Sequence, residues 1–370
     1  MRLLRSNAAE RTDIVLSAAL LLAVSLTLAW ANGSNDVSKG IAALAGSGIA
    51  TPRAAWLLGV FATLAGGLGA ISWGGALGAL FGGGFLKSAE GLPLGAALAA
   101  LAGAAGFVAL STWQRWPVST THALIGGIIG AAAAQFGIRD VAYRVVAAKF
   151  LVPLLASPAL AIALCWTLLL LNRLVEARMP QWTPGCCAPE DHMKDPFICA
   201  APDRRPSPAM RRVWLALHWL SGGAVSFARG LNDVPKMAAL IIPALAAWPA
   251  TETTASGPAL AIALTSFAMT GGALMSGRRL LPVLAQEVST MTPTTGLFAN
   301  FGTAFLVLGA TPLGLPVSTT HVAAGSIIGV RVADKAPPRA RDALRTILLA
   351  WLVTLPAAAA FSAILVVLGA

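Results

Sequence analysis

The chain contains two nearly identical segments, PVSTTHALIGGIIG at residues 117–130 and PVSTTHVAAGSIIG at residues 316–329. In each segment three consecutive hydroxyl residues follow a proline and a valine, and a run of small and apolar residues typical of a closely packed helix comes after them. The same hexapeptide begins both segments and the same IIG ends them. The sequence therefore predicts an internal duplication.

The composition indicates a membrane protein. Of the 370 residues, 57% are hydrophobic and only 11% are charged, with a mean hydropathy of +0.75, whereas soluble domains carry about 25% charged residues. The net charge of +11 lies mostly in the polar segments between apolar stretches. Basic segments in these places are the ordinary orientation signal of a membrane protein, so we expect no nucleic-acid partner.

The apolar stretches predict an all-α polytopic membrane protein with about 10–12 membrane segments. In the first half they lie near 14–31, 54–72, 74–86, 92–111, 118–134 and 150–171. In the second half they lie near 213–228, 238–248, 258–275, 295–310, 316–330 and 346–369. The first stretch is interpreted as a span rather than as a cleaved signal peptide.

A polar segment, residues 172–212, separates a first repeat (1–171) from a second repeat (213–370). It carries seven Lys and Arg residues, which favours a cytoplasmic position. Repeats in transporters often have inverted topology, and we expect this here. Residues 37–50 and the segments after the two hexapeptide prolines are short or rich in glycine, so we expect broken or re-entrant helices there.

A second motif is also duplicated. Residues 31–43, ANGSNDVSKGIAA, align with residues 228–240, ARGLNDVPKMAAL, and the two hexapeptides follow in the same order. In membrane proteins, repeats of this kind indicate a transporter-like fold whose site lies at the repeat interface.

The hexapeptides suggest an anion site. Pro117 and Pro316 interrupt a helix, because proline lacks the amide hydrogen and disfavours helix in the residue before it. A helix that starts at Ser119 or Ser318 leaves amide groups free at its positive end, where hydroxyl side chains serve as caps. Three hydroxyls exceed the need of one cap, so the surplus donors of two such starts could surround one tetrahedral oxyanion without Arg or Lys. His122 and His321 would orient the hydroxyls or pack.

The duplicated Asn-Asp pairs are the second group of polar residues expected within the membrane. Carboxylates there are costly and usually functional. Asp36 and Asp233 could bind a cation such as Na⁺ beside the Asn carbonyls, accept a proton from phosphate, or form ion pairs with a lysine three residues on. These charge partners are Lys39 and Lys236.

Together, GSNDVSK (33–39), GLNDVPK (230–236) and the two PVSTTH copies resemble the signatures of the inorganic phosphate transporter family of sodium- or proton-coupled permeases. The stretch QEVSTMTPTTGLFANFGTAF (286–305) is also similar to the family's second half. The resemblance implies a homodimer in the lipid bilayer with inverted repeats, no cofactor, and Na⁺ or H⁺ as the coupling ion. It implies a phosphate site made by Ser119, Thr120, Thr121, Ser318, Thr319, Thr320, Asn35 and Asn232. It implies a Na⁺ site made by Asp36, Asp233, Asn35 and Asn232.

The chain departs from the family pattern at some positions. Lys39 and Lys236 replace small or polar residues, and Asn300 stands where many members have Glu. We hypothesise that the two ammonium groups substitute for part of the cation requirement, leaving fewer coupled Na⁺ ions or H⁺ coupling. In the competing interpretation the lysines face away and the chain is an ordinary Na⁺ symporter.

The expected function is therefore cation-coupled phosphate symport, in the inner (plasma) membrane of a bacterium. A transporter of sulfate or another tetrahedral oxyanion on the same fold is the main alternative. An intramembrane hydrolase that uses one of the serines and histidines is disfavoured, because two equivalent nucleophiles are present where an enzyme needs one. A passive anion channel is a further alternative.

Overall fold

The computed structural model describes residues 2–82, 92–114, 116, 118–179, 208–246, 257–277, 292–333 and 339–369. The regular elements of this described part are helices, as the sequence predicts. Those of the first half are α1 (Arg2–Gly46), α2 (Pro52–Trp73), α3 (Gly75–Phe81), α4 (Leu94–Trp113), α5 (Thr120–Phe136), α6 (Tyr143–Val146) and α7 (Val152–Arg178). Those of the second half are α8 (Pro208–Ala246), α9 (Gly257–Ser276), α11 (Pro293–Ala310), α12 (Thr319–Ala333) and α13 (Arg339–Val367).

Several helices are long and apolar enough to cross a bilayer. In the described part they cover Ile14–Gly46, Pro52–Trp73, Leu94–Trp113, Tyr143–Arg178 and Gly257–Ser276. The chain is therefore a multi-pass membrane protein. The total of about 10–12 membrane segments stays a prediction, because α5, α8, α11 and α12 are shorter or less apolar than these spans.

Two predicted helix boundaries are wrong. The apolar stretch 213–228 and the described part of 238–248, residues 238–246, belong to one helix, α8. Residues 37–46 continue α1 instead of forming a separate half-helix. The polar residues of α1 and α8 near these places, among them Asp36 and Asp233, are buried inside the protein. A helix can carry such residues through the membrane when the surrounding protein, rather than lipid, faces them.

Both ends of the predicted linker segment lie in helices. The helix α7 continues to Arg178 and α8 begins at Pro208, so both ends of the predicted 172–212 segment are helical. Residues 180–207 lie outside the described part of the chain. The division into repeats at these boundaries stays a prediction.

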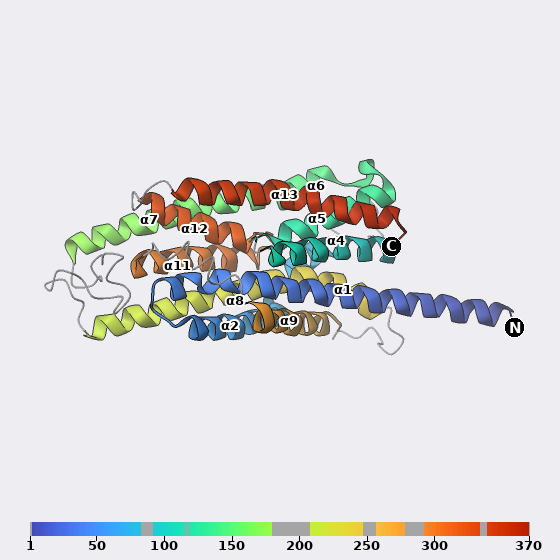
Figure 1. Ribbon diagram of the computed structural model, residues 1–370, viewed down its shortest axis with the longest axis horizontal. Coiled ribbons are helices and arrows are strands. Elements are labelled where there is room, and N and C mark those ends of the chain that lie inside the picture. The colour runs from blue at the N-terminus through green and yellow to red at the C-terminus, as the bar shows by residue number, and fades with distance from the viewer. Residues whose placement is uncertain are drawn as a thin grey trace.

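The two halves pack in a matched way. The helix α2 packs on α8 and its counterpart α9 packs on α1, while α5 packs on α13 and its counterpart α12 packs on α7. Figure 1 shows α1 running away from the end marked N and α8 running toward it, and α7 and α13 are likewise opposed. Opposed directions of matched helices are what inverted repeats would produce. The orientation of each half in a bilayer stays a prediction.

Glycines let the matched helices approach closely at equivalent crossings. A Cβ atom added at Gly66 of α2 would lie 1.9 Å from the Phe227 carbonyl oxygen of α8. At the matched crossing, a Cβ added at Gly272 of α9 would lie 1.9 Å from the Trp30 carbonyl oxygen of α1. Small residues at helix interfaces allow this contact between backbones in membrane proteins.

The α5–α13 and α12–α7 pairs repeat this arrangement. A Cβ added at Gly130 of α5 would lie 2.0 Å from the Ala359 carbonyl oxygen of α13. A Cβ added at Gly329 of α12 would lie 2.4 Å from the Ile162 carbonyl oxygen of α7. Both classes of helix pair therefore rest on backbone contact at glycine.

We predict that Gly66→Ala destabilises the protein, because its methyl group would force α2 away from α8 at a cost of about 1–3 kcal/mol. Gly106→Ala is the matched control: Gly106 also lies within a helix, α4, but a Cβ there meets nothing within 4 Å. Thermal unfolding in detergent should show a lower midpoint for Gly66→Ala only. Equal midpoints for both variants would contradict the close crossing.

Candidate functional site

The first residues of α5 and α12 meet inside the protein. Ser119 is the N-cap residue of α5, and its Oγ accepts a hydrogen bond from the His122 amide at 3.3 Å. Ser318 Oγ accepts in the same way from the His321 amide at 3.4 Å. The Ser318 hydroxyl donates to Ser119 Oγ at 2.9 Å, so the two helix starts are in direct contact. Pro117, to which we assigned the first helix break, lies outside the described residues.

The two histidines pack against each other at this junction. The ring centroids of His122 and His321 lie 4.5 Å apart, with the rings inclined at 70°. His122 Nδ1 lies 2.8 Å from Ser119 Oγ. A Ser–His contact can activate a nucleophile, but this serine oxygen also caps a helix and accepts the bond from Ser318. The histidine therefore orients the hydroxyl of a helix cap.

The threonines of the first hexapeptide contact polar groups of both halves. Thr120 Oγ1 accepts a hydrogen bond from Asn32 Nδ2 of α1 at 2.6 Å. Thr121 Oγ1 accepts one from Lys236 Nζ of α8 at 3.0 Å. Both threonines are buried. Their hydroxyl groups thus lie between α1 and α8, the helices that carry the Asn-Asp motifs.

The threonines of the second hexapeptide lie at the start of α12. Thr319 is its first residue and is buried. Thr320 Oγ1 accepts a hydrogen bond from Lys39 Nζ of α1 at 2.6 Å. Lys39 of the first half therefore contacts a threonine of the second half, and Lys236 of the second half likewise contacts Thr121 of the first half.

Each aspartate of the Asn-Asp motifs forms an ion pair within its own helix. Lys39 Nζ pairs with Asp36 Oδ1, and Lys236 Nζ lies 3.3 Å from Asp233 Oδ1. The four side chains are buried, with at most 6% of any of them exposed. An unpaired charge at the centre of a membrane costs about 3 kcal/mol on insertion scales, so pairing is what allows these groups to lie there. The lysines do not face away from the site.

Each ammonium group also donates a hydrogen bond to the backbone carbonyl oxygen of the valine that precedes the hydroxyl residues. Lys39 Nζ donates to the Val118 carbonyl oxygen at 3.1 Å. Lys236 Nζ donates to the Val317 carbonyl oxygen at 3.0 Å. The valine of each hexapeptide thus presents its carbonyl group to the lysine of its own half.

The motif asparagines are buried beside the ion pairs. Asn35 Nδ2 donates to Thr112 Oγ1 at 3.0 Å and to the Trp116 carbonyl oxygen at 3.4 Å. Asn232 Nδ2 donates to Asp233 Oδ1 at 2.8 Å and to the Val317 carbonyl oxygen at 3.2 Å. Within the described residues, the Oδ1 atoms of Asn35 and Asn232 have no hydrogen-bond partner. In the described part of the chain, each amide therefore keeps a buried acceptor oxygen without a donor, on the residue directly before a motif aspartate.

Arg229 is a site residue that we did not predict from the sequence. It is 1% exposed, and it donates to Asn32 Oδ1 at 3.3 Å and to Thr63 Oγ1 at 2.7 Å. Its Nε has no hydrogen-bond partner among the described residues. The alignment of ANGSND with ARGLND contained the signal, because it places Arg229 opposite Asn32 and an arginine within a membrane helix is usually functional.

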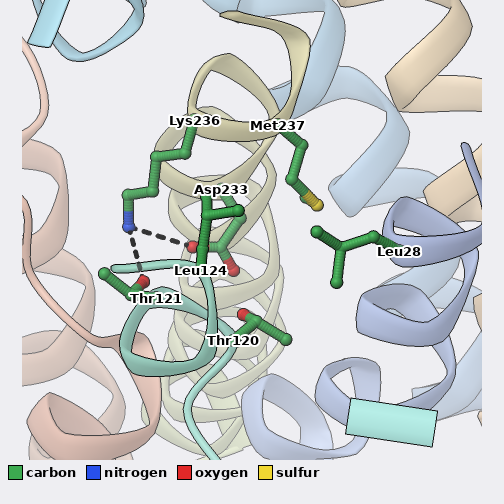
Figure 2. Close-up of a pocket in the computed structure, with 7 residues that line it drawn as sticks. All are labelled: Leu28, Thr120, Thr121, Leu124, Asp233, Lys236 and Met237. Carbon is green, nitrogen blue, oxygen red and sulfur yellow. Dashed lines mark hydrogen bonds and ion pairs between the residues drawn. The ribbon is translucent and has the colours of Figure 1, made fainter. Parts of the chain in front are cut away.

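A small pocket opens beside these groups. It is lined by Leu28, Thr120, Thr121, Leu124, Asp233, Lys236 and Met237. Figure 2 shows Lys236 joined to both Asp233 and Thr121 on one side, with Leu28 and Met237 on the other. Hydroxyl donors, an ammonium group and a carboxylate acceptor therefore face one small space, a combination that suits an oxyanion carrying a proton.

Comparisons with known proteins agree on one family. The sequence profile of the phosphate transporter family matches residues 32–362. A probable low-affinity inorganic phosphate transporter of Mycobacterium bovis is 28% identical over 340 residues, which cover 92% of this chain and 74% of the relative. A putative phosphate permease of Pyrococcus abyssi is 26% identical over 395 residues, covering 94% and 96%.

A solved structure, that of a protein named as a sodium-dependent phosphate transporter, has the same fold. Its TM-score is 0.78 at 23% sequence identity, and the match covers 95% of this chain and 98% of that chain. The family and these relatives are transporters, not enzymes, which agrees with the role of the serines as helix caps. Because the family profile spans most of the sequence, from Asn32 in α1 to Ser362 in α13, the chain belongs to the phosphate transporter family.

Proposed function

We propose that the protein is a secondary active transporter that carries inorganic phosphate across the membrane by symport with a cation, Na⁺ or H⁺. The observation that carries this proposal is the contact between the two hydroxyl-rich helix starts, Ser318 to Ser119, with both Asn-Asp motifs around it. A site assembled from both halves of a duplicated chain can be opened to either side when the halves move against each other.

Phosphate would bind between the starts of α5 and α12. The donors are the hydroxyls of Ser119, Thr120, Thr121, Ser318, Thr319 and Thr320. The positive ends of the helices favour a negative charge at this position. Bound phosphate would separate the Ser318–Ser119 contact and take over its hydrogen bonds. The reverse exchange would release phosphate, since hydrogen bonds and not covalent bonds would hold it.

The coupling cation would interact with the Asn-Asp motifs. Carboxylate and carbonyl oxygens are the ligands that hard cations prefer. Asp36 and Asp233 supply the carboxylates, and Asn35 and Asn232 supply the acceptor oxygens that lack a partner among the described residues. The structural relative is named as sodium-dependent, which supports a cation as the coupled ion.

We further propose that the protein works as a homodimer in the plasma membrane of a bacterium. The family resemblance found in the sequence supports this assembly. Mass measurement of the detergent-solubilised protein by light scattering tests it, and a particle of one protomer mass would contradict it.

We predict that Thr120→Ala and Thr319→Ala each lower phosphate uptake into proteoliposomes by about tenfold or more, since a hydrogen bond to a charged group contributes about 1.5–3 kcal/mol. Thr27→Ala is the control, because Thr27 is an exposed residue of α1 whose hydroxyl donates to the Ala23 carbonyl oxygen of its own helix. Wild-type uptake by both hexapeptide variants would show that phosphate binds elsewhere.

Sulfate should compete poorly with phosphate. Both ions are tetrahedral, but phosphate retains a proton that Asp233, which lines the pocket beside Thr120 and Thr121, can accept. Sulfate has no proton to donate and would leave this buried carboxylate facing an anion, at a cost of about 1–3 kcal/mol or more. Labelled-phosphate uptake in the presence of equimolar unlabelled sulfate measures this. Strong inhibition would favour a general oxyanion transporter.

A further inference from the structure

The two motif lysines have the same surroundings in both halves. An ammonium group has three donors, and each of the two lysine ammonium groups contacts three oxygen atoms. Lys39 Nζ contacts Asp36 Oδ1, the Val118 carbonyl oxygen and Thr320 Oγ1. Lys236 Nζ contacts Asp233 Oδ1, the Val317 carbonyl oxygen and Thr121 Oγ1. Each ammonium therefore lies among one carboxylate, one backbone carbonyl and one hydroxyl oxygen.

These oxygen shells are of the kind that binds a metal cation. Carboxylate, carbonyl and hydroxyl oxygens are hard ligands, and transporters bind Na⁺ through such oxygens where the backbone is not helical. Val118 and Val317 lie outside α5 and α12, directly before their caps, so their carbonyl groups are free of the helical bonding pattern. An ammonium ion and Na⁺ carry the same charge and compete for the same oxygens.

We propose that the Lys39 and Lys236 ammonium groups occupy the two cation positions of the phosphate site, so that phosphate binds and is carried without Na⁺. This inference rests on the proposed transport function and makes it more specific, since H⁺ is then the coupling cation. The lysines are cations attached to the chain that replace ions taken from solution.

The contacts between halves show that the lysines do more than neutralise their own aspartates. An ion pair within one helix needs only Asp36 and Lys39. Yet Lys39 of the first half also holds Thr320 of the second, and Lys236 of the second half also holds Thr121 of the first. Both ammonium groups therefore bind hydroxyls of the proposed phosphate site. A positive charge next to these hydroxyls favours the binding of an anion.

The local charge balance supports the same inference. The described residues at the junction include three buried cationic groups, Lys39, Lys236 and Arg229, against the carboxylates of Asp36 and Asp233. With the lysines present, the fixed charge is positive and suits an anion. Without them, the two carboxylates would outnumber Arg229, and phosphate would need added cations.

The first test measures uptake of labelled phosphate into proteoliposomes that contain the purified wild-type protein. One set of vesicles has a proton gradient and no Na⁺, with choline as the replacement, and the other has a Na⁺ gradient at uniform pH. We expect concentrative uptake with the proton gradient alone and no stimulation by Na⁺. Uptake that requires Na⁺ would overturn the lysine inference but support the proposed transport, and no uptake under either gradient would contradict the transport function itself.

The second test restores a requirement for Na⁺. In the double variant Lys39→Ala and Lys236→Ala, both oxygen shells lose their ammonium and gain space, so Na⁺ should bind there. We expect Na⁺-free uptake to be lost and Na⁺ to raise uptake by about tenfold or more, within the usual range of coupling between two ligands. Lys149→Ala is the control, because Lys149 lies exposed on the π-helical segment Ala147–Leu151 and should leave uptake independent of Na⁺.

Direct binding distinguishes a cation role from a purely structural one. Radioactive ²²Na⁺ should bind to the detergent-solubilised double variant and not to the wild type. A lysine that only supports packing would give a variant that loses uptake and binds no Na⁺, and this result would overturn the inference. If the double variant does not fold, Na⁺-independent uptake by the wild type still decides the question.

Discussion

The structure depends on the pairing of charges that lie deep in an apolar chain. Lys39, Lys236, Arg229, Asp36 and Asp233 are buried where lipid or hydrocarbon side chains would otherwise surround them. Pairing offsets the cost of removing each charge from water only when good geometry and further hydrogen bonds accompany it. Both lysines meet this condition, because every ammonium donor finds an oxygen. The helices α1, α5, α8 and α12 must therefore meet at one place, because without α5 or α12 a buried ammonium donor would have no oxygen partner.

This pairing also explains why the chain carries two copies of each motif. Asp and Lys pair within one helix, but the hydroxyl that completes each lysine shell comes from the other half. One half alone would bury an ammonium with an unfilled donor. The duplication therefore has an energetic basis, and it brings the two hexapeptides into one buried polar cluster.

Much of the fold could be predicted from the sequence, because apolar stretches and paired motifs are local signals. The helical class and the ion pair of Asp36 with Lys39 follow from hydropathy and from spacing along a helix. The continuity of α8 could not be predicted, because its polar middle is stable only against helices distant in sequence. The alignment of the two motifs could have marked Arg229 as a candidate, but its partners Asn32 and Thr63 belong to the other half and could not be predicted. The partners of the lysines beyond their own helix required the tertiary structure.

The glycine crossings have a consequence for motion. The backbones of α2 and α8 touch at Gly66, and those of α5 and α13 touch at Gly130. At these crossings no side chain lies between the helices that could change its rotamer and let them slide. We expect such pairs to move as rigid bodies. The junction of α5 and α12 is different, because hydroxyl, histidine and lysine side chains form it and these can exchange partners. The molecule thus consists of rigid helix pairs that contact each other through polar side chains. A bound substrate would link the pairs, and its release would leave them free to move against each other.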